Sequence, residues 1–217
     1  MNMPIPDVSI ADRQRFHAAI GRFDEENAAD PNMEVANGSA QPRELLYAKR
    51  LTDWVLKLQK DASESLQLAA RCQHICRWHS PRSAYPMDRI GYLKWRADLK
   101  KFHAAKAGEI LRETGYDEAM VEQVQALNLK KDFPKNEDSR VLEDALCLVF
   151  LEFQYSELAT KTDEKKMVTV LKKSWAKMTD QARSEALRLP FSPVELGLIQ
   201  SAIESDNVDA PHTVITT

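Results

Sequence analysis

Glycine is scarce in this chain, with six residues among 217. Folds rich in tight turns depend on glycine for left-handed backbone conformations, so the shortage disfavours a turn-heavy all-β fold and favours helices. The chain also has no Gly-rich phosphate loop, no dinucleotide fingerprint, no HExxH and no GxSxG. Nucleotide binding through those loops, zincin-type proteolysis and serine hydrolysis therefore have no local support.

Cysteine and long apolar runs are scarce too. Three cysteines without a signal-like apolar run near the first residue predict reduced thiols in a cytoplasmic protein. The longest uninterrupted apolar run, Ala145 to Leu151, is far shorter than the roughly 20 residues that span a bilayer. We therefore expect no membrane partner, while nothing in the sequence fixes the oligomeric state.

The composition that remains is that of a globular helical protein, with 43% hydrophobic and 29% charged residues. We expect an extended lead-in over residues 1–10, a single helical domain over 11–204 and a flexible tail over 205–217. Apolar residues recur at helical spacing, and no alternating run is long enough for a strand. Helices are expected to begin at the capping residues Asp61, Asp88, Asp117 and Asp163, and at Thr179 or Asp180. The predicted class is all-α, with eight or nine helices and a loop over 31–41.

The most apolar of these helices is expected to begin at Glu137 or Asp138 and to run through the letters VLEDALCLVFLEFQYSEL. A helix that is hydrophobic nearly all round should be buried near the centre of the domain. It nevertheless carries Glu143 and Asp144, which point about 100° apart, so at least one carboxylate should face inward. The alternative is that both lie in polar first turns, where acids favour the helix dipole.

The segment from Arg71 to Lys106 has the opposite character. It holds nine Lys and Arg against two acids, a local charge of +7 in a chain whose net charge is −3. Arginine forks suit phosphate or carboxylate, and aromatic faces can stack on a base or on a guanidinium. The candidate substrate-binding residues are Arg77, Trp78, Arg82, Tyr85, Arg89, Tyr92, Arg96 and Lys100. The alternative is an internal salt-bridge network with the acidic remainder.

Two histidines and one acid form a candidate metal set: His74, His103 and Asp144. A His-His-carboxylate combination suits Mn, Fe or Zn, although a lone histidine beside a core is more often structural. Cys72, Cys76 and His79 follow one helical face, but they lack a fourth zinc ligand, for which Cys147 is a weak candidate.

Three blocks of the sequence resemble an uncharacterised family, domain of unknown function 4202, whose members are sometimes labelled glutamyl-tRNA synthetase. The blocks are AARCQHICRW, PRSAYPMDRIGYLKWRADLKKFHAAKAGEIL and LEDALCLVFLE. A more distant resemblance is to the HD metal-dependent phosphohydrolases, which are all-α and use histidines and aspartates as metal ligands. That resemblance implies an HD-like fold, with His74 at the His-Asp pair, His103 at a helix-start histidine and Asp144 at the last aspartate. The pair itself is not His-Asp here, and the early histidine is missing.

The resemblance implies a metal-dependent hydrolase acting on a phosphorylated or otherwise anionic small molecule. In such an enzyme, Glu143 or another nearby acid would accept a proton. One alternative is a non-catalytic HD-like module that binds RNA or an acidic partner through its basic segment. Another is a non-haem iron oxygenase, since the same three ligands serve O₂ chemistry.

Overall fold

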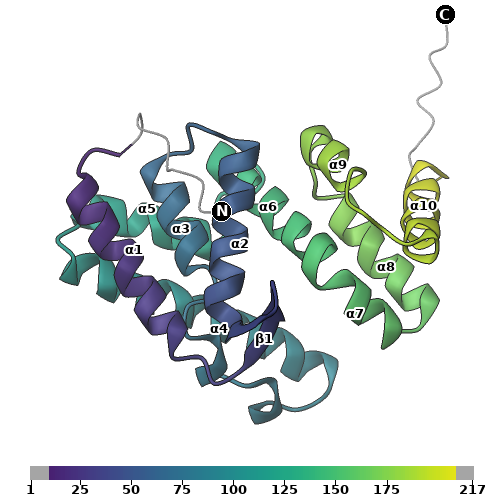
Figure 1. Cartoon of the computed structure of the whole chain (residues 1–217), viewed down its shortest axis with the longest axis horizontal. Helices are drawn as coiled ribbons and strands as arrows, with labels where there is room; N and C mark the ends of the chain where they lie inside the picture. The colour runs from purple at the N-terminus through teal and green to yellow at the C-terminus, as the bar shows by residue number, and fades with distance from the viewer. Residues whose placement is uncertain (1–9, 209–217) are drawn as a thin grey trace, which may run out of the picture. The chain divides into compact units, whose positions relative to one another are not determined.

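The computed structural model describes residues 10–208, with side chains up to residue 204, and its backbone is mainly helical. The chain divides into two compact units, one up to Leu142 and one from Glu143 onward, so that the division falls inside a helix. Figure 1 labels the helices of both units.

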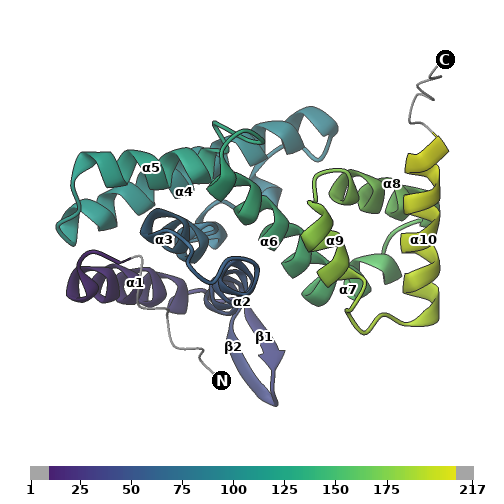
Figure 2. The same ribbon diagram turned by 90° about the horizontal axis from the view of Figure 1, so that it is seen from above.

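Helices from distant parts of the sequence pack together in the first unit. Its elements are α1 (Arg13–Ala28), β1 (Met33–Ala36), β2 (Ser39–Pro42), α2 (Arg43–Leu58), α3 (Glu64–Cys72), two short 3₁₀ turns (Arg77–His79 and Arg82–Ala84), α4 (Arg89–Glu113), α5 (Glu118–Leu129) and the start of α6 (Glu137–Phe153). Helix α3 packs against α1, α2 and α5, and α4 packs against α5. Figure 2 shows α3 between α1 and α2 on one side and α4 and α5 on the other.

Side-chain caps explain where several helices begin. Asp88 accepts a hydrogen bond from the amide of Gly91 at the start of α4, and Asp117 accepts one from Met120 at the start of α5. Such caps satisfy amides that have no partner inside the helix. Both were expected from the sequence, whereas α3 begins later than expected because Ser63, rather than Asp61, is its cap.

The core of the first unit forms where these helices meet. Phe16 and Phe23 of α1, Leu51 of α2, Leu66 of α3 and Leu111 of α4 are almost completely buried. Burying a large apolar side chain contributes about 1.5–3 kcal/mol, so this inner layer fixes how the helices lie against one another.

The expected loop over residues 31–41 is wrong in one respect, because it contains a two-stranded antiparallel hairpin in which Met33 pairs with Pro42. The turn is formed by Asn37 and Gly38, both with positive φ, as a tight hairpin turn requires. The strands are four residues each and no residue in them is buried, so no apolar alternation marks them in the sequence.

The second unit consists of the rest of α6, followed by α7 (Tyr155–Thr160), α8 (Glu164–Trp175), α9 (Asp180–Ala186) and α10 (Pro193–Val208). Helix α8 packs against α10, and the hydroxyl of Tyr155 donates to the carbonyl of Glu195 in α10. Asp163 and Thr179 cap α8 and α9, as the sequence predicts. Over residues 10–208, no helix has the length and apolarity needed to cross a membrane.

The all-α class is confirmed. The described part of the chain holds ten α-helices, because the helix expected to run on past Phe153 is interrupted at Gln154, whose φ of −125° is not helical. Helix α6 is buried along most of its length, including Leu142, Ala145 and Leu148. Whether the arrangement is HD-like remains a prediction.

Candidate functional site

A cluster of buried and half-buried ionisable side chains lies inside the first unit, where α2, the turn after α3 and α4 come together. Its members are Glu44 from α2, His74 and Arg77 from the turn, and His103 from α4. Glu44 was not among the candidates from the sequence, where it reads as an ordinary acid in the first turn of a helix. Its spacing from the buried residues Tyr47 and Leu51, at i+3 and i+7, is the signal that would have found it.

Glu44 is only 7% exposed, and its Oε2 atom has no hydrogen-bond partner among the described residues. Its backbone amide donates to Oδ2 of Asp30 at 3.0 Å, which fixes the start of α2. Burial raises the pKa of the Glu44 carboxyl from 4.5 to about 7, although the positive charge of Arg77 opposes this shift. The carboxyl therefore exchanges its proton near neutral pH.

His74 stands between Glu44 and Arg77. Its Nδ1 atom is 3.6 Å from Oε2 of Glu44, its Nε2 atom is 3.3 Å from Nη1 of Arg77, and its ring stacks on Tyr47 with centroids 4.2 Å apart. Burial, and then the charges of Arg77, Lys130 and Arg96, hold the pKa of His74 well below 6.5. The imidazole is therefore neutral at physiological pH.

His103 is 4% exposed, and its ring centroid lies 5.8 Å from that of His74. Its Nδ1 atom is 2.8 Å from the carbonyl oxygen of Ile75, so Nδ1 carries the proton and Nε2 keeps a lone pair. That Nε2 atom is buried and has no partner among the described residues. Burial, and then the neighbouring His74, lower the pKa of His103 to about 3.

Arg77 is the positive member of the cluster. Its Nε atom is 3.9 Å from Oε1 of Glu44, and its guanidinium lies over Trp95, 5.1 Å from the ring centroid. Part of the internal salt-bridge alternative is thus realised, since Arg71 also pairs with Asp24 at 2.7 Å. Arg77 remains about one third exposed, so an incoming anion can reach it.

The other predicted substrate-binding residues have varied surroundings. Arg82 donates to the carbonyls of Tyr85, Pro86 and Asp88 and so organises the loop before α4. The hydroxyl of Tyr85 donates to Asp98. Trp78 lies in the 3₁₀ turn Arg77–His79 and is half-buried, and the rest lie on α4, partly or fully exposed: Arg89, Tyr92, Arg96 and Lys100.

Glu143 and Asp144 belong to the second unit, where both are buried and both have partners. Asp144 accepts from the amide and the hydroxyl of Thr179, at 2.9 and 2.5 Å, and so anchors the start of α9. Glu143 accepts from Nζ of Lys177 at 3.0 Å. The sequence argument that an acid of this helix faces inward is correct, and the contacts found for both acids are structural.

We tested whether these residues fit the expected divalent metal. Within residues 10–208, no three His, Cys, Asp or Glu side chains already stand close enough together to hold an ion. Cys72 is paired with Asn128 and Cys76 with Glu26, while His79 is exposed. His74 and His103 do have the chemistry of metal ligands, because both are neutral and the buried Nε2 atom of His103 lacks a partner.

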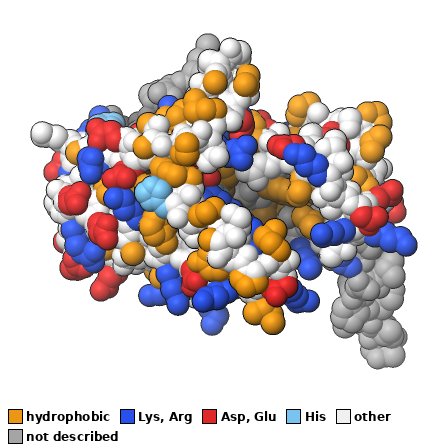
Figure 3. Space-filling model, turned by 90° about the horizontal axis from the view of Figure 1, so that it is seen from below, with side chains coloured by type: hydrophobic (Ala, Val, Ile, Leu, Met, Phe, Trp, Pro, Cys, Tyr) orange, Lys and Arg blue, Asp and Glu red, His pale blue; other side chains and the backbone are white. Residues whose placement is uncertain are grey.

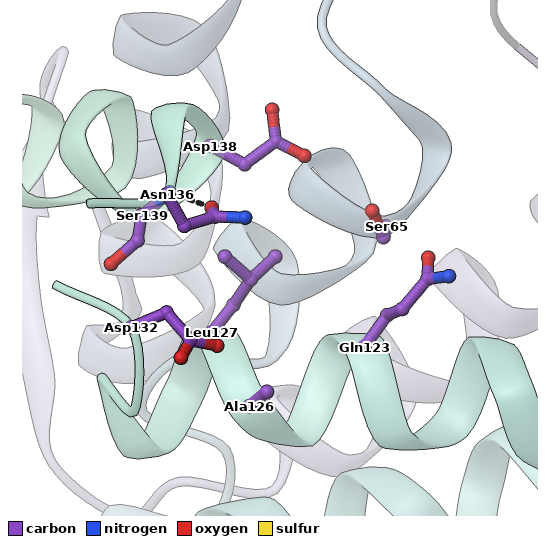
Figure 4. A pocket seen from close by; sticks show the side chains of 8 residues that line it. All are labelled: Ser65, Gln123, Ala126, Leu127, Asp132, Asn136, Asp138 and Ser139. Carbon is purple, nitrogen blue, oxygen red and sulfur yellow. Dashed lines mark hydrogen bonds between the residues drawn. The ribbon is translucent and has the colours of Figure 1, made fainter.

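A pocket elsewhere in the first unit has different chemistry. It encloses about 160 Å³, and its lining includes Ser65, Gln123, Asp132, Asn136 and Asp138. Figure 4 shows the carboxylate of Asp138 directed toward Ser65. Asp138 also accepts a hydrogen bond from the hydroxyl of Ser63 at 2.6 Å, which links the start of α6 to the cap of α3. This hollow contains no basic group and none of the residues expected from the sequence.

Comparison with known proteins supplies a family. The model of a family described as a domain of unknown function (DUF4202) matches residues 17–199. The chain belongs to this family. Its description names no activity, so membership covers the whole candidate site without assigning it a reaction. No curated protein and no solved structure matches the chain.

Proposed function

We propose that the cluster of Glu44, His74, Arg77 and His103 is the active site of a metal-dependent hydrolase that acts on a phosphorylated or otherwise anionic small molecule. The observation that carries the proposal is that two neutral imidazoles, a buried carboxyl with a raised pKa and a partly exposed guanidinium meet in one partly buried cluster. Clusters of strongly shifted ionisable groups are typical of catalytic sites. The distant resemblance to HD phosphohydrolases supports the same class.

The roles follow from the chemistry of each side chain. Arg77 would bind the anionic part of the substrate, since a planar guanidinium matches phosphate or carboxylate oxygens. His103, fixed by the Ile75 carbonyl, would offer its Nε2 lone pair to a cation or to a hydrogen-bond donor. A divalent metal such as Mn, Fe or Zn, held by His74 and His103, would supply a Lewis acid and a more acidic bound water. The proton-accepting role of Glu143 stays a prediction.

The proposal is tested by measuring release of phosphate from a panel of phosphorylated small molecules, with the protein loaded in turn with Mn, Fe and Zn. The expected result is metal-dependent hydrolysis that falls at least tenfold in Arg77→Ala, while Lys101→Ala, which changes an exposed basic residue on the same segment, retains it. Equal activity in the Arg77 and Lys101 variants would contradict the role given to the cluster.

A second candidate, a non-catalytic module that binds RNA or an acidic partner, is favoured by the surface at the start of α4. Met87, Ile90 and Leu93 are 79%, 79% and 55% exposed, and Arg89 and Lys94 beside them are exposed as well. On the face seen in Figure 3, apolar side chains likewise reach the surface among Lys and Arg. Tight RNA binding that collapses as salt is raised, together with no hydrolysis, would favour this candidate.

A further inference from the structure

We infer that Glu44 completes a divalent-cation site with His74 and His103, so that the carboxylate of this site comes from α2 of the same unit rather than from Asp144. The inference rests on the proposed function and names the ligands of that site. It concerns a borderline metal ion of the Mn, Fe or Zn kind, which takes imidazole nitrogen and carboxylate oxygen together.

Two buried acceptors in the cluster lack a hydrogen-bond donor within reach. Oε2 of Glu44 and Nε2 of His103 are both buried without a hydrogen-bond partner among the described residues. Leaving a buried polar atom unsatisfied costs about 1–3 kcal/mol. Both atoms are acceptors, so one cation bound between the side chains would satisfy them together, whereas another acceptor would not.

A backbone carbonyl holds the His103 imidazole in a fixed orientation. His103 donates its Nδ1 proton to the carbonyl of Ile75, at 2.8 Å, and this contact fixes the ring and leaves Nε2 as the free lone pair. A hydrogen bond of this kind on the far nitrogen is the usual support of a metal-ligating histidine. With its ring proton on Nδ1, His103 presents an unprotonated and unpartnered Nε2 atom that can bind a cation directly.

The spacing of His74 and Glu44 and the charge next to them also suit a cation. Nδ1 of His74 and Oε2 of Glu44 are 3.6 Å apart, close to the roughly 3.4 Å that separates two ligands of one tetrahedral ion at metal–ligand distances of about 2.1 Å. A cation already faces both residues, since Arg77 lies 3.3 Å from His74 and 3.9 Å from Glu44. Because a guanidinium can only donate, Nε2 of His74 accepts from Arg77 and Nδ1 carries the ring proton. Binding therefore requires the guanidinium to withdraw, the His74 proton to move to Nε2, and the three side chains to close around the ion.

Asp144 is the less suitable carboxylate. Both of its oxygens accept hydrogen bonds from Thr179, and those donors would be left unsatisfied if the carboxylate turned to a metal. Glu44 loses no such bond, because the hydrogen bond at its position is made by its backbone amide to Asp30.

The test is Co²⁺ binding to the full-length protein at neutral pH, followed by visible absorption and by equilibrium dialysis. The wild type is expected to bind Co²⁺ at a single site and to develop a visible band. Glu44→Gln and His103→Gln should each weaken the affinity at least tenfold, the lower end of what even an outer partner of a metal site is worth. Glu44→Asp, which keeps a carboxylate, should retain more affinity than Glu44→Gln.

Two matched controls should leave the band and the affinity unchanged: Asp144→Asn, the other candidate carboxylate, and His79→Gln, an exposed histidine of the same segment. Far-UV circular dichroism establishes that each variant is folded. Arg77→Ala should strengthen Co²⁺ binding, because it removes a competing cation, even though it is expected to weaken hydrolysis.

Loss of the band in Asp144→Asn with retention in Glu44→Gln would overturn the inference, as would a wild type that binds no Co²⁺. Specific Co²⁺ binding without hydrolysis of any phosphorylated substrate would keep the cation site and remove the hydrolase. Metal-free hydrolysis that depends on Arg77 would keep the hydrolase and remove the cation site.

Discussion

The two units of this protein bury carboxylates in opposite ways. In the second unit, Asp144 has both oxygens occupied by Thr179, and Glu143 is paired with Lys177. In the first unit, Glu44 is equally buried, yet one of its oxygens has no partner and its pKa is raised to about 7. The comparison teaches that burial of an acid does not identify a functional site. Glu44 differs because one of its buried oxygens lacks a hydrogen-bond partner and because it lies near His103, whose buried Nε2 atom also lacks one.

The largest effect on stability is expected at Asp144, the buried acid whose two oxygens both accept hydrogen bonds. Asp144→Ala removes the acceptor of both Thr179 donors and should lower the free energy of unfolding by about 3 kcal/mol, since hydrogen bonds to charged groups are worth about 1.5–3 kcal/mol each. Urea unfolding monitored by circular dichroism measures the change. Asp144→Asn keeps one acceptor oxygen and should lose less than half as much, and equal losses would contradict the account.

Replacing the buried acid of the first unit, in Glu44→Gln, should raise the free energy of unfolding at alkaline pH rather than lower it. Because the folded-state pKa of Glu44 is raised above its unfolded value of 4.5, the contribution of this carboxyl to stability is fully present below pH 4.5. That contribution is lost as pH rises through about 7, and the loss is about 3 kcal/mol. Glu44→Gln does not titrate, so in metal-free protein its stability relative to the wild type should improve by that amount between pH 4.5 and 8.5.

The charged and titratable groups that face Glu44 are Arg77, Asp30, His103, Arg43 and His74. They are common to both proteins, so their own titration largely cancels in the difference. Glu26→Gln is the matched control, because hydrogen bonding to Lys106 lowers the pKa of Glu26 against the opposing effect of burial. Its wild-type contribution is present above pH 4.5 and is lost as pH falls, and the same sign in both variants would refute the assignment.

The sequence predicts what is local and fails where burial is decided by distant parts of the chain. The starts of α4, α5, α8 and α9 follow from a capping residue next to an apolar helical pattern, and all were predicted. His74 and His103, 29 positions apart, were paired as candidates, and their rings do lie together. Glu44 was missed because its first-turn position favours an acid for local reasons, while its burial arises from the residues that α2, α3 and α4 bring around it.

The smallest effect on stability is expected in the β1–β2 hairpin. This hairpin follows Asp30, the acid that accepts a hydrogen bond from the Glu44 amide at the start of α2. Gly38 has a φ of +76°, so Gly38→Ala introduces a side chain into a left-handed conformation and should lower the free energy of unfolding by about 1 kcal/mol. No atom lies within 4 Å of the added methyl group, so the cost is conformational rather than steric.

Gly38→Ala should nevertheless leave the cluster intact. The start of α2 is held by the bond from the Glu44 amide to Asp30, which precedes the hairpin, and not by the turn itself. Thermal melting should therefore show a small decrease while Co²⁺ affinity is unchanged. Asp30→Ala is the contrasting variant: it removes the acceptor at the start of α2, so it should lower both stability and Co²⁺ affinity. If Gly38→Ala weakened Co²⁺ binding as much as Asp30→Ala, the position of Glu44 would depend on the hairpin turn. The turn and the buried cluster would then not be independent.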